Sequence, residues 1–265
     1  MCFRNRSDYD QELFGMMDFD TFKKGIDECA KQGVYSIRLS WRGECTTNPH
    51  LAEMINYAKK SGIKEVSFFT NGFKLKGKLA EDVVKAGVDY ITISVDGMYE
   101  QYNKVRAPLT FEGIVDRLQN LRFLRDKLGK GYPRIRINSV WKESYGEKWF
   151  QNMYDFFSPI VDYMTFSPEH AFDRTKKKLR PNFTCQFPFQ RMGVMWDGSI
   201  PLCIGDKKIE YRIGNVAEDS LYDLWHSRRM NKARALHMNY RASEIPCCNT
   251  CDRAVTKNVG NIKLK

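Results

Sequence analysis

Residues 65–97 read EVSFFTNGFKLKGKLAEDVVKAGVDYITISVDG, and the pattern of this stretch recurs over much of the chain. Its two ends, EVSFFT (65–70) and DYITISVD (89–96), are short runs of β-branched and aromatic residues that are typical of buried strands. Between them KLAEDVVKAG (78–87) has apolar residues at helical spacing and ends at a glycine, which commonly terminates helices. This order predicts two parallel strands joined by a helix.

The same alternation extends from residue 19 to residue 165. Further strands are predicted at VYSIRLS (34–40), RIRINSV (134–140) and DYMTFS (162–167). Further helices are predicted within 19–33, 48–62 and 110–129, and each of these stretches ends at a glycine. Strand and helix in strict alternation predict an α/β fold with a parallel sheet or a barrel.

Polar residues stand near the carboxyl ends of the predicted strands. Open α/β sheets and βα barrels bind their ligands at that edge. Any one of these residues could be an ordinary turn residue, but their recurrence on all five strands favours a site. They are Ser40, Thr70, Ser94, Asp96, Asn138, Ser139 and Ser167.

The composition indicates a globular chain with a sizeable core. Of the 265 residues, 42% are hydrophobic and 13% are aromatic, and the mean hydropathy is −0.53. We find no apolar run near the roughly 20 residues of a membrane span, and the first residues, MCFRNRS, have no secretory-signal pattern. We therefore expect a soluble, cytoplasmic protein without a membrane partner.

The formal net charge is +11, and part of it lies in RTKKKLR (174–180). Such a run is most often a solvated loop, although its charge attracts anionic partners. The basic residues are not interleaved with aromatic ones, as a platform for single-stranded nucleic acid requires. A nucleic-acid partner is therefore not expected.

Eight cysteines are the most informative residues. In a reducing compartment such a set more often binds metal than forms disulfides. Four thiolates, two from separated loops and two from a terminal C-x-x-C, can surround a metal centre, and the spacing alone leaves zinc and iron–sulfur open. The cysteines are Cys2, Cys29, Cys45, Cys185, Cys203, Cys247, Cys248 and Cys251.

The last third of the chain carries an ordered set of motifs. They are Cys185-Gln-Phe-Pro188, the turn Trp196-Asp197-Gly198, Pro201-Leu-Cys203, Gly214-Asn215-Val216, Ser220-Leu221 with Trp225, and Cys248-Asn-Thr-Cys251-Asp252. This set resembles a SPASM domain, the auxiliary-cluster extension of radical S-adenosylmethionine (SAM) enzymes. The resemblance implies an auxiliary 4Fe–4S cluster with Cys185, Cys203, Cys248 and Cys251 as its metal ligands, and Cys247 as the competing neighbour of Cys248.

The front of the chain agrees with this resemblance. MCFR (1–4) resembles the end of the C-x-x-x-C-x-x-C motif of the catalytic 4Fe–4S cluster, with Cys2 as the third cysteine. SWRGEC (40–45) resembles the Gly-Gly-Glu-Pro-like stretch that holds the SAM amino group, with Gly43 and Glu44 kept. Arg42 stands in place of the first glycine and Cys45 in place of the proline, while FFTNG (68–72) and ISVDG (93–97) match the next two strand ends.

The resemblance implies a fold and a domain plan. We expect a partial (β/α)6 TIM-like barrel that lacks its first strand over residues 1–180, and a small Cys-rich auxiliary-cluster domain over residues 181–265. Cys2 would complete a motif whose first two cysteines stand upstream of Met1. We therefore expect the chain to be truncated at its start and, as given, neither to assemble the catalytic cluster nor to cleave SAM.

The resemblance also implies roles for the strand-end residues. Glu44 would accept from the SAM ammonium group, and Ser94 and Asp96 would lie near the ribose and methionine parts. Arg106 would pair with the methionine carboxylate, a task suited to a guanidinium fork, unless it forms a surface ion pair. Asn138 would contact the ribose.

Several other residues have weaker assignments. Cys29 is expected to be a buried apolar thiol, and Cys45 to pack near the SAM site. His170 is the first choice for a substrate contact. The further substrate-contact candidates are Tyr145, Tyr163 and Glu169. The histidines expected on helix surfaces are His50, His226 and His237.

The leading interpretation is a radical SAM enzyme that reductively cleaves SAM to a 5′-deoxyadenosyl radical and abstracts hydrogen from a peptide or a polar small molecule. Flavodoxin or ferredoxin would supply the electron. One alternative is a non-catalytic zinc- or iron–sulfur-binding protein on a degenerate barrel. Another is a radical SAM enzyme that acts on RNA or a nucleotide.

Overall fold

The computed structural model describes residues 14–129, 131–142, 144–169, 182–206, 208–249 and 251. The chain divides into two compact units, which we describe separately. The sheet unit comprises the described residues of Gly33–Glu169, and the cysteine unit comprises those of Met1–Gln32 and His170–Val259. In the described part no helix is long and apolar enough to cross a membrane.

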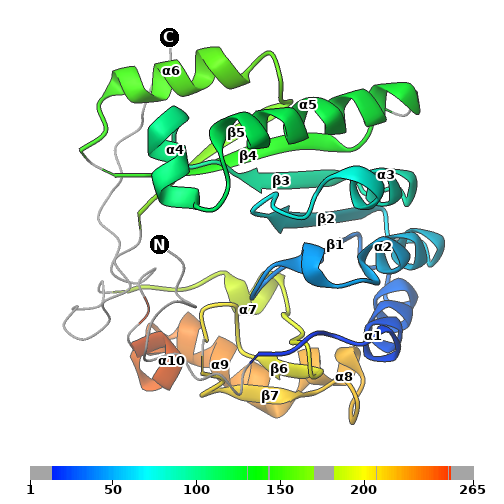
Figure 1. The fold of residues 1–265 in the computed structure, drawn as a ribbon. Coiled ribbons are helices and arrows are strands. Elements are labelled where there is room, and N and C mark those ends of the chain that lie inside the picture. The colour runs from blue at the N-terminus through cyan, green and yellow to red at the C-terminus, as the bar shows by residue number, and fades with distance from the viewer. Residues whose placement is uncertain are drawn as a thin grey trace. The chain divides into compact units, whose positions relative to one another are not determined.

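A five-stranded parallel sheet forms the sheet unit. Its strands are β1 (Ser36–Arg38), β2 (Glu65–Thr70), β3 (Tyr90–Ser94), β4 (Arg134–Trp141) and β5 (Tyr163–Pro168). They lie side by side in chain order, every neighbouring pair is parallel, and Figure 1 shows this sequence from β1 to β5. A doubly wound sheet reverses its strand order, whereas this one does not. The order is that of a partial barrel, as predicted.

Helices connect the strands. They are the 3₁₀ turn η3 (Cys45–Thr47), α2 (Leu51–Lys60), α3 (Gly77–Lys85), α4 (Tyr99–Arg106), α5 (Phe111–Lys127) and α6 (Glu147–Phe157). Alternate strand residues form the core, because successive side chains of a strand point to opposite faces. On β3 and β4 the fully buried apolar residues are Ile91, Ile93, Ile135 and Ile137.

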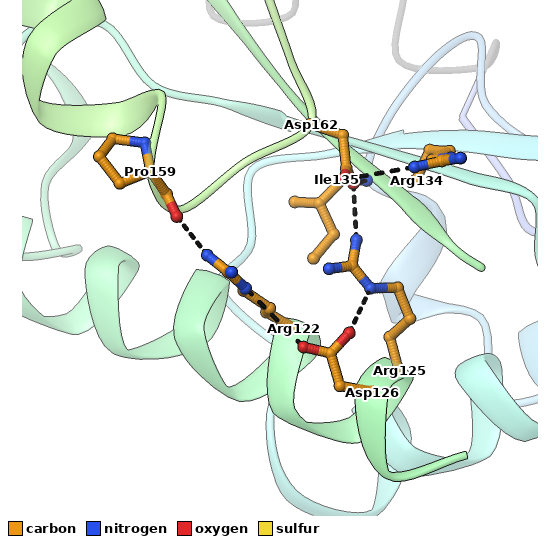
Figure 2. Close-up of polar contacts among 7 residues, drawn as sticks. All are labelled: Arg122, Arg125, Asp126, Arg134, Ile135, Pro159 and Asp162. Atoms are coloured by element: carbon orange, nitrogen blue, oxygen red, sulfur yellow. Dashed lines mark hydrogen bonds and ion pairs between the residues drawn. The ribbon is translucent and has the colours of Figure 1, made fainter. Parts of the chain in front are cut away.

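At the amino edge of the sheet, aspartates that precede strands tie the units of the repeat together. Asp162 accepts from the backbone N–H of Ile135 on β4 and from the Arg125 guanidinium on α5, both at 2.7 Å. Figure 2 shows this network, in which Arg125 also reaches Asp126 at 2.9 Å. Asp89, which precedes β3, has the same kind of partners: its carboxylate accepts from the backbone N–H of Val66 at 2.7 Å and from the ammonium of Lys59 at 2.8 Å.

Helix α1 (Phe19–Lys31) belongs to the cysteine unit. Asp18 caps it by accepting from the N–H of Thr21 at 2.8 Å. From this helix Lys24 donates to the carbonyl of Ala217 at 2.7 Å, and Glu28 accepts from the N–H of Leu221. The expectation that this helix belongs to the barrel domain stays a prediction. The boundary expected near residue 180 falls outside the described residues and stays a prediction.

The rest of the cysteine unit is a small hairpin covered by short helices. Its elements are α7 (Phe187–Gln190), the antiparallel β6 (Ser199–Pro201) and β7 (Arg212–Asn215), α8 (Leu221–His226), α9 (Arg228–Met238), η4 (Ala242–Glu244) and α10 (Pro246–Asn249). Its core is apolar and includes two cysteines: Ile200, Leu202, Ile213, Leu224, Met230, Ala233, Ala242, Ile245, Cys247 and Cys248.

Candidate functional site

The turn after β1 fixes the Glu44 carboxylate at the carboxyl edge of the sheet. Gly43 has φ +84°, a conformation that only glycine adopts readily, and Glu44 then caps η3. Its Oε1 accepts from the N–H of Thr46 at 3.2 Å, from the Thr46 hydroxyl at 2.7 Å and from the Thr70 hydroxyl at 2.6 Å. Its Oε2 accepts from the N–H of Asn71 at 2.7 Å. The carboxylate therefore links the ends of β1 and β2.

These contacts leave capacity on one oxygen of Glu44. A carboxylate oxygen has about two lone pairs. Oε1 already serves three N–H and O–H donors, with the Cys45 sulfur at 4.0 Å, whereas Oε2 serves one donor. In the described residues no cation pairs with Glu44. Oε2 is thus a fixed acceptor that fits an ammonium group, the chemistry expected of this position.

The ends of β3, β4 and α4 meet at Asp96. Its side chain is 3% exposed; Oδ1 accepts from the N–H of Val140 at 2.6 Å, and Oδ2 accepts from Nε of Arg106 at 2.7 Å. Arg106 Nη2 also pairs with Asp96, and its side chain is 23% exposed. The structure thus brings together two residues that we predicted separately. Asp96 holds one edge of the guanidinium, so only Nη1 has no contact with this aspartate.

Ser94 and Asn138 lie opposite each other in the β3–β4 register. Oδ1 of Asn138 accepts from the hydroxyls of Thr165 at 2.9 Å and Ser167 at 3.1 Å on β5. Because the amide oxygen serves these two donors, the Nδ2 amino group is the part of Asn138 that can donate to a ligand.

In the cysteine unit, the predicted Asp197-Gly198 turn leads into β6. Asp197 accepts from the N–H of Ser199 at 3.0 Å and from its hydroxyl at 2.9 Å, and Gly198 has φ +80°. The chain then delivers Cys203, whose sulfur accepts from the N–H of Gly205 at 3.2 Å. Backbone N–H donors to sulfur are among the groups that tune iron–sulfur clusters.

The thiols of the cysteine unit influence one another. Burial, and to a smaller extent the nearby Cys247 and Cys251, raise the pKa of Cys203 to about 12. A hydrogen bond with Cys248 and then burial raise the pKa of Cys247. Cys251 N–H donates to the carbonyl of Cys248 at 3.1 Å. Sulfur donors dominate this set, which suits iron–sulfur or zinc.

His237 on α9 was predicted on a helix surface, and that prediction is wrong. Its side chain is fully buried, and burial lowers its pKa. Nδ1 accepts from the N–H of Cys185 at 3.3 Å, and Nε2 lies 3.6 Å from the sulfur of Cys248. His237 therefore joins the first and third expected ligands. Its spacing from Met230 and Ala233, which are also buried, was the signal for a buried helix face.

Some of the predicted site residues do not come together in a metal site, and others lie outside the described residues. In the described ranges no three His, Cys, Asp or Glu side chains form a group that could hold a metal ion. Cys2, His170, the 174–180 run and Asp252 lie outside the described residues. The assignments of Cys185, Cys203, Cys248 and Cys251 as ligands therefore stay predictions.

The secondary candidates have ordinary surroundings. Cys45 donates to the carbonyl of Phe69 at 3.1 Å, and Cys29 is half-buried with its pKa raised to about 11 by burial. The Tyr145 ring lies 4.8 Å from that of Trp149. Tyr163 is 49% exposed, and Glu169 pairs with Lys142 at 3.4 Å.

His50 and His226 lie on helix surfaces as predicted.

Comparison with known proteins identifies both parts of the chain. The radical SAM superfamily matches residues 1–130, and the SPASM iron–sulfur cluster-binding domain matches residues 185–263. The first match includes the strand-end residues from Glu44 to Arg106, and the second includes the four cysteines expected as ligands, Cys185, Cys203, Cys248 and Cys251.

Three relatives illustrate the range of similarity. The tungsten-containing aldehyde ferredoxin oxidoreductase cofactor-modifying protein of Pyrococcus furiosus is 25% identical over 300 residues, which cover 95% of this chain and 82% of that protein. A probable GTP 3′,8-cyclase of Methanococcus maripaludis is 32% identical over 115 residues, 43% of this chain and 38% of the cyclase. The structure of native anSMEcpe with bound AdoMet and Cp18Cys peptide has a TM-score of 0.61 at 16% identity, covering 90% of this chain and 82% of that one.

The two domains define the class and the cofactors. The protein is an enzyme whose cofactors are a 4Fe–4S cluster, SAM and an auxiliary 4Fe–4S cluster. The fixed acceptor at Glu44 and the sulfur donors of the cysteine unit fit these groups. The chain belongs to the radical SAM superfamily and carries a SPASM-type iron–sulfur cluster-binding domain.

Proposed function

We propose that the protein cleaves SAM reductively to methionine and a 5′-deoxyadenosyl radical, which abstracts hydrogen from a peptide or a polar small molecule. The observation that carries this proposal is the fixed Glu44 carboxylate at the same strand edge as the Asp96–Arg106 pair. When bound, the catalytic cluster supplies the electron for the cleavage. The residues of this chain bind and orient SAM.

Each strand-end residue has one group to offer. Oε2 of Glu44 accepts from the SAM ammonium group. Asp96 holds the guanidinium of Arg106 in one orientation, so that Nη1 can donate to the methionine carboxylate. Nδ2 of Asn138 donates to a ribose hydroxyl, with Ser94 as its neighbour in register. In the cysteine unit, Cys185, Cys203, Cys248 and Cys251 hold the auxiliary cluster.

The substrate class rests on weaker support. The anSMEcpe neighbour is described with a bound peptide, and the cyclase relatives are named for GTP. Both are polar molecules, and the net charge of +11 favours anionic ones. The electron donor is proposed to be a flavodoxin or a ferredoxin.

The test is an anaerobic assay of the protein expressed from its complete gene. Under dithionite it should convert SAM to 5′-deoxyadenosine and methionine, and it should retain about four irons in the cysteine unit, as a Cys₄ set requires. One stoichiometric zinc with no iron, or no 5′-deoxyadenosine from iron-loaded protein, would refute the proposal.

The auxiliary ligands are tested with adjacent variants. Cys248→Ser should remove the auxiliary cluster, because it takes away one of four thiolates. Cys247→Ser is the matched control and should keep the iron. The reverse result would assign the ligand to Cys247.

A further inference from the structure

The face of the sheet opposite the buried isoleucines carries three arginines, Arg38, Arg134 and Arg136. Arg136 on β4 alternates with Ile135 and Ile137, which are fully buried, so it points to the other face of the sheet. Phe69, Thr92 and Arg136 lie on neighbouring strands in one register row. The guanidinium carbons of Arg38 and Arg136 lie 4.8 and 5.7 Å from the centroid of the Phe69 ring. Two cations thus share one aromatic ring.

Arg136 differs from the arginines at the two edges of the sheet. Arg106 has Asp96 as its partner, and Arg125 and Arg134 have Asp162. Arg136 donates from Nε to the Thr92 hydroxyl at 2.9 Å, and within the described residues no carboxylate pairs with it. Its two terminal amino groups are the fork that binds carboxylate or phosphate through two hydrogen bonds.

The location connects this pair to the candidate SAM site. Arg136 precedes Asn138 by two residues on the same strand face, a rise of roughly 7 Å. A group bound at Arg136 would therefore lie one residue layer below Asn138 and Ser94.

We propose that Arg38, Phe69 and Arg136 bind an oxyanion of the substrate, a carboxylate or a phosphate group. This inference rests on the proposed function, because it assumes that a substrate enters the face beneath the SAM site. Phe69 holds the two guanidinium groups by cation–π contact, and Thr92 orients Arg136.

The test measures oxyanion binding to the anaerobically reconstituted full-length protein with SAM present. Tripolyphosphate and succinate are titrated by calorimetry, with sodium chloride at equal ionic strength as the blank. We expect at least one probe to bind, and Arg136→Gln to weaken its binding about tenfold or more, because a hydrogen bond between charged groups is lost. Tripolyphosphate binding would indicate a phosphate source, and succinate binding a carboxylate source.

Arg134→Gln is the matched control. It lies on the same strand and face, has the same charge change, and pairs with Asp162 at 3.7 Å. It should alter binding less than about twofold. If neither probe binds, the proposal is wrong. It is also wrong if Arg134→Gln weakens binding as much as Arg136→Gln, because the general positive charge of the face then accounts for the binding.

Two further measurements complete the test. Arg38→Gln changes an exposed side chain, should fold normally and should also weaken binding, so it serves if Arg136→Gln does not fold. Unchanged binding in Arg38→Gln would remove Arg38 from the proposed site. Formation of 5′-deoxyadenosine by the wild-type protein is measured separately. Its absence would refute the proposed function, whereas loss of probe binding concerns only the oxyanion site.

Discussion

The sheet unit and the cysteine unit stabilise their polar groups in different ways. In the sheet unit, Asp162 and Asp96 each have a guanidinium and a backbone N–H as partners. In the cysteine unit, burial is the largest cause that raises the pKa of the Cys203 thiol. For the Cys247 thiol, a hydrogen bond with Cys248 comes first and burial second. Iron binds the thiolate, so ionisation and metal binding are coupled in this unit. We therefore expect the sheet unit to keep its fold without a metal and the cysteine unit to depend on its iron.

Metal removal gives the largest expected difference between the units. Chelation of iron under anaerobic conditions should open the cysteine unit, because binding free energy is folding free energy in small metal domains. Trypsin should then cut within residues 212–241 on the order of tenfold faster or more, while residues 33–169 stay protected. Mass spectrometry of the fragments measures this. Equal protection of both units after complete iron removal would contradict the comparison.

Glu44→Gln tests whether the strand edge of the sheet unit serves a ligand. Replacement of the carboxylate by an amide removes a charged acceptor, so SAM affinity should fall about tenfold to a hundredfold. Calorimetry with SAM measures the change, and thermal unfolding reports any loosening of the turn. Glu53→Gln is the control, because Glu53 is exposed and, among the residues that the structure describes, pairs with His50 at 3.0 Å. Similar SAM affinities for both variants would exclude the Glu44 role.

Asp162→Asn tests the hydrogen bonds of Asp162 with Arg125 and Ile135 at the amino edge of the sheet. Asp162 and Arg125 are 19% and 11% exposed, so their pair is partly buried. Loss of the Asp162–Arg125 ion pair should lower the free energy of unfolding of the sheet unit by about 2 kcal/mol, less than the loss of a fully buried pair would. Hydrogen exchange of the β4 amides in urea measures it. Asp126→Asn, at a 57% exposed side chain, should cost less than about 0.5 kcal/mol. Equal costs would contradict the distinction.

The sequence predicted the sheet well because strand periodicity is local. The predicted 65–70 coincides with β2, and 134–140 differs from β4 by one residue. Helix α4 was not among the predicted helices, because Tyr102 is its one buried residue and an apolar face is absent. Helix α1 was predicted from its local pattern, but its contacts with Ala217 and Leu221, nearly 200 residues away, leave no local signal.

The candidate site was only partly predictable, because contacts between residues far apart in the sequence leave no local signal. Motifs identified Glu44, Asp96 and Arg106, but the Asp96–Arg106 pairing comes from the fold. Arg136 was absent from the candidates because its row partners Phe69 and Thr92 come from other strands. The burial of His237 could have been predicted from its spacing with Met230 and Ala233, but its contacts with Cys185 and Cys248 come from the fold. Tertiary proximity carries information that spacing does not.

The smallest expected effect concerns Cys45, the thiol of the sheet unit beside Glu44. Its sulfur donates to the carbonyl of Phe69 at 3.1 Å, a bond that a serine hydroxyl can also make. Cys45→Ser should therefore cost less than about 1 kcal/mol and change SAM cleavage less than about twofold. Iron content should stay unchanged, whereas Cys203→Ser should lose the auxiliary cluster. Iron analysis of both variants from the same preparation decides the matter. Loss of iron in Cys45→Ser would make Cys45 a metal ligand, and the expected contrast between a sheet unit that keeps its fold without a metal and a metal-dependent cysteine unit would then fail.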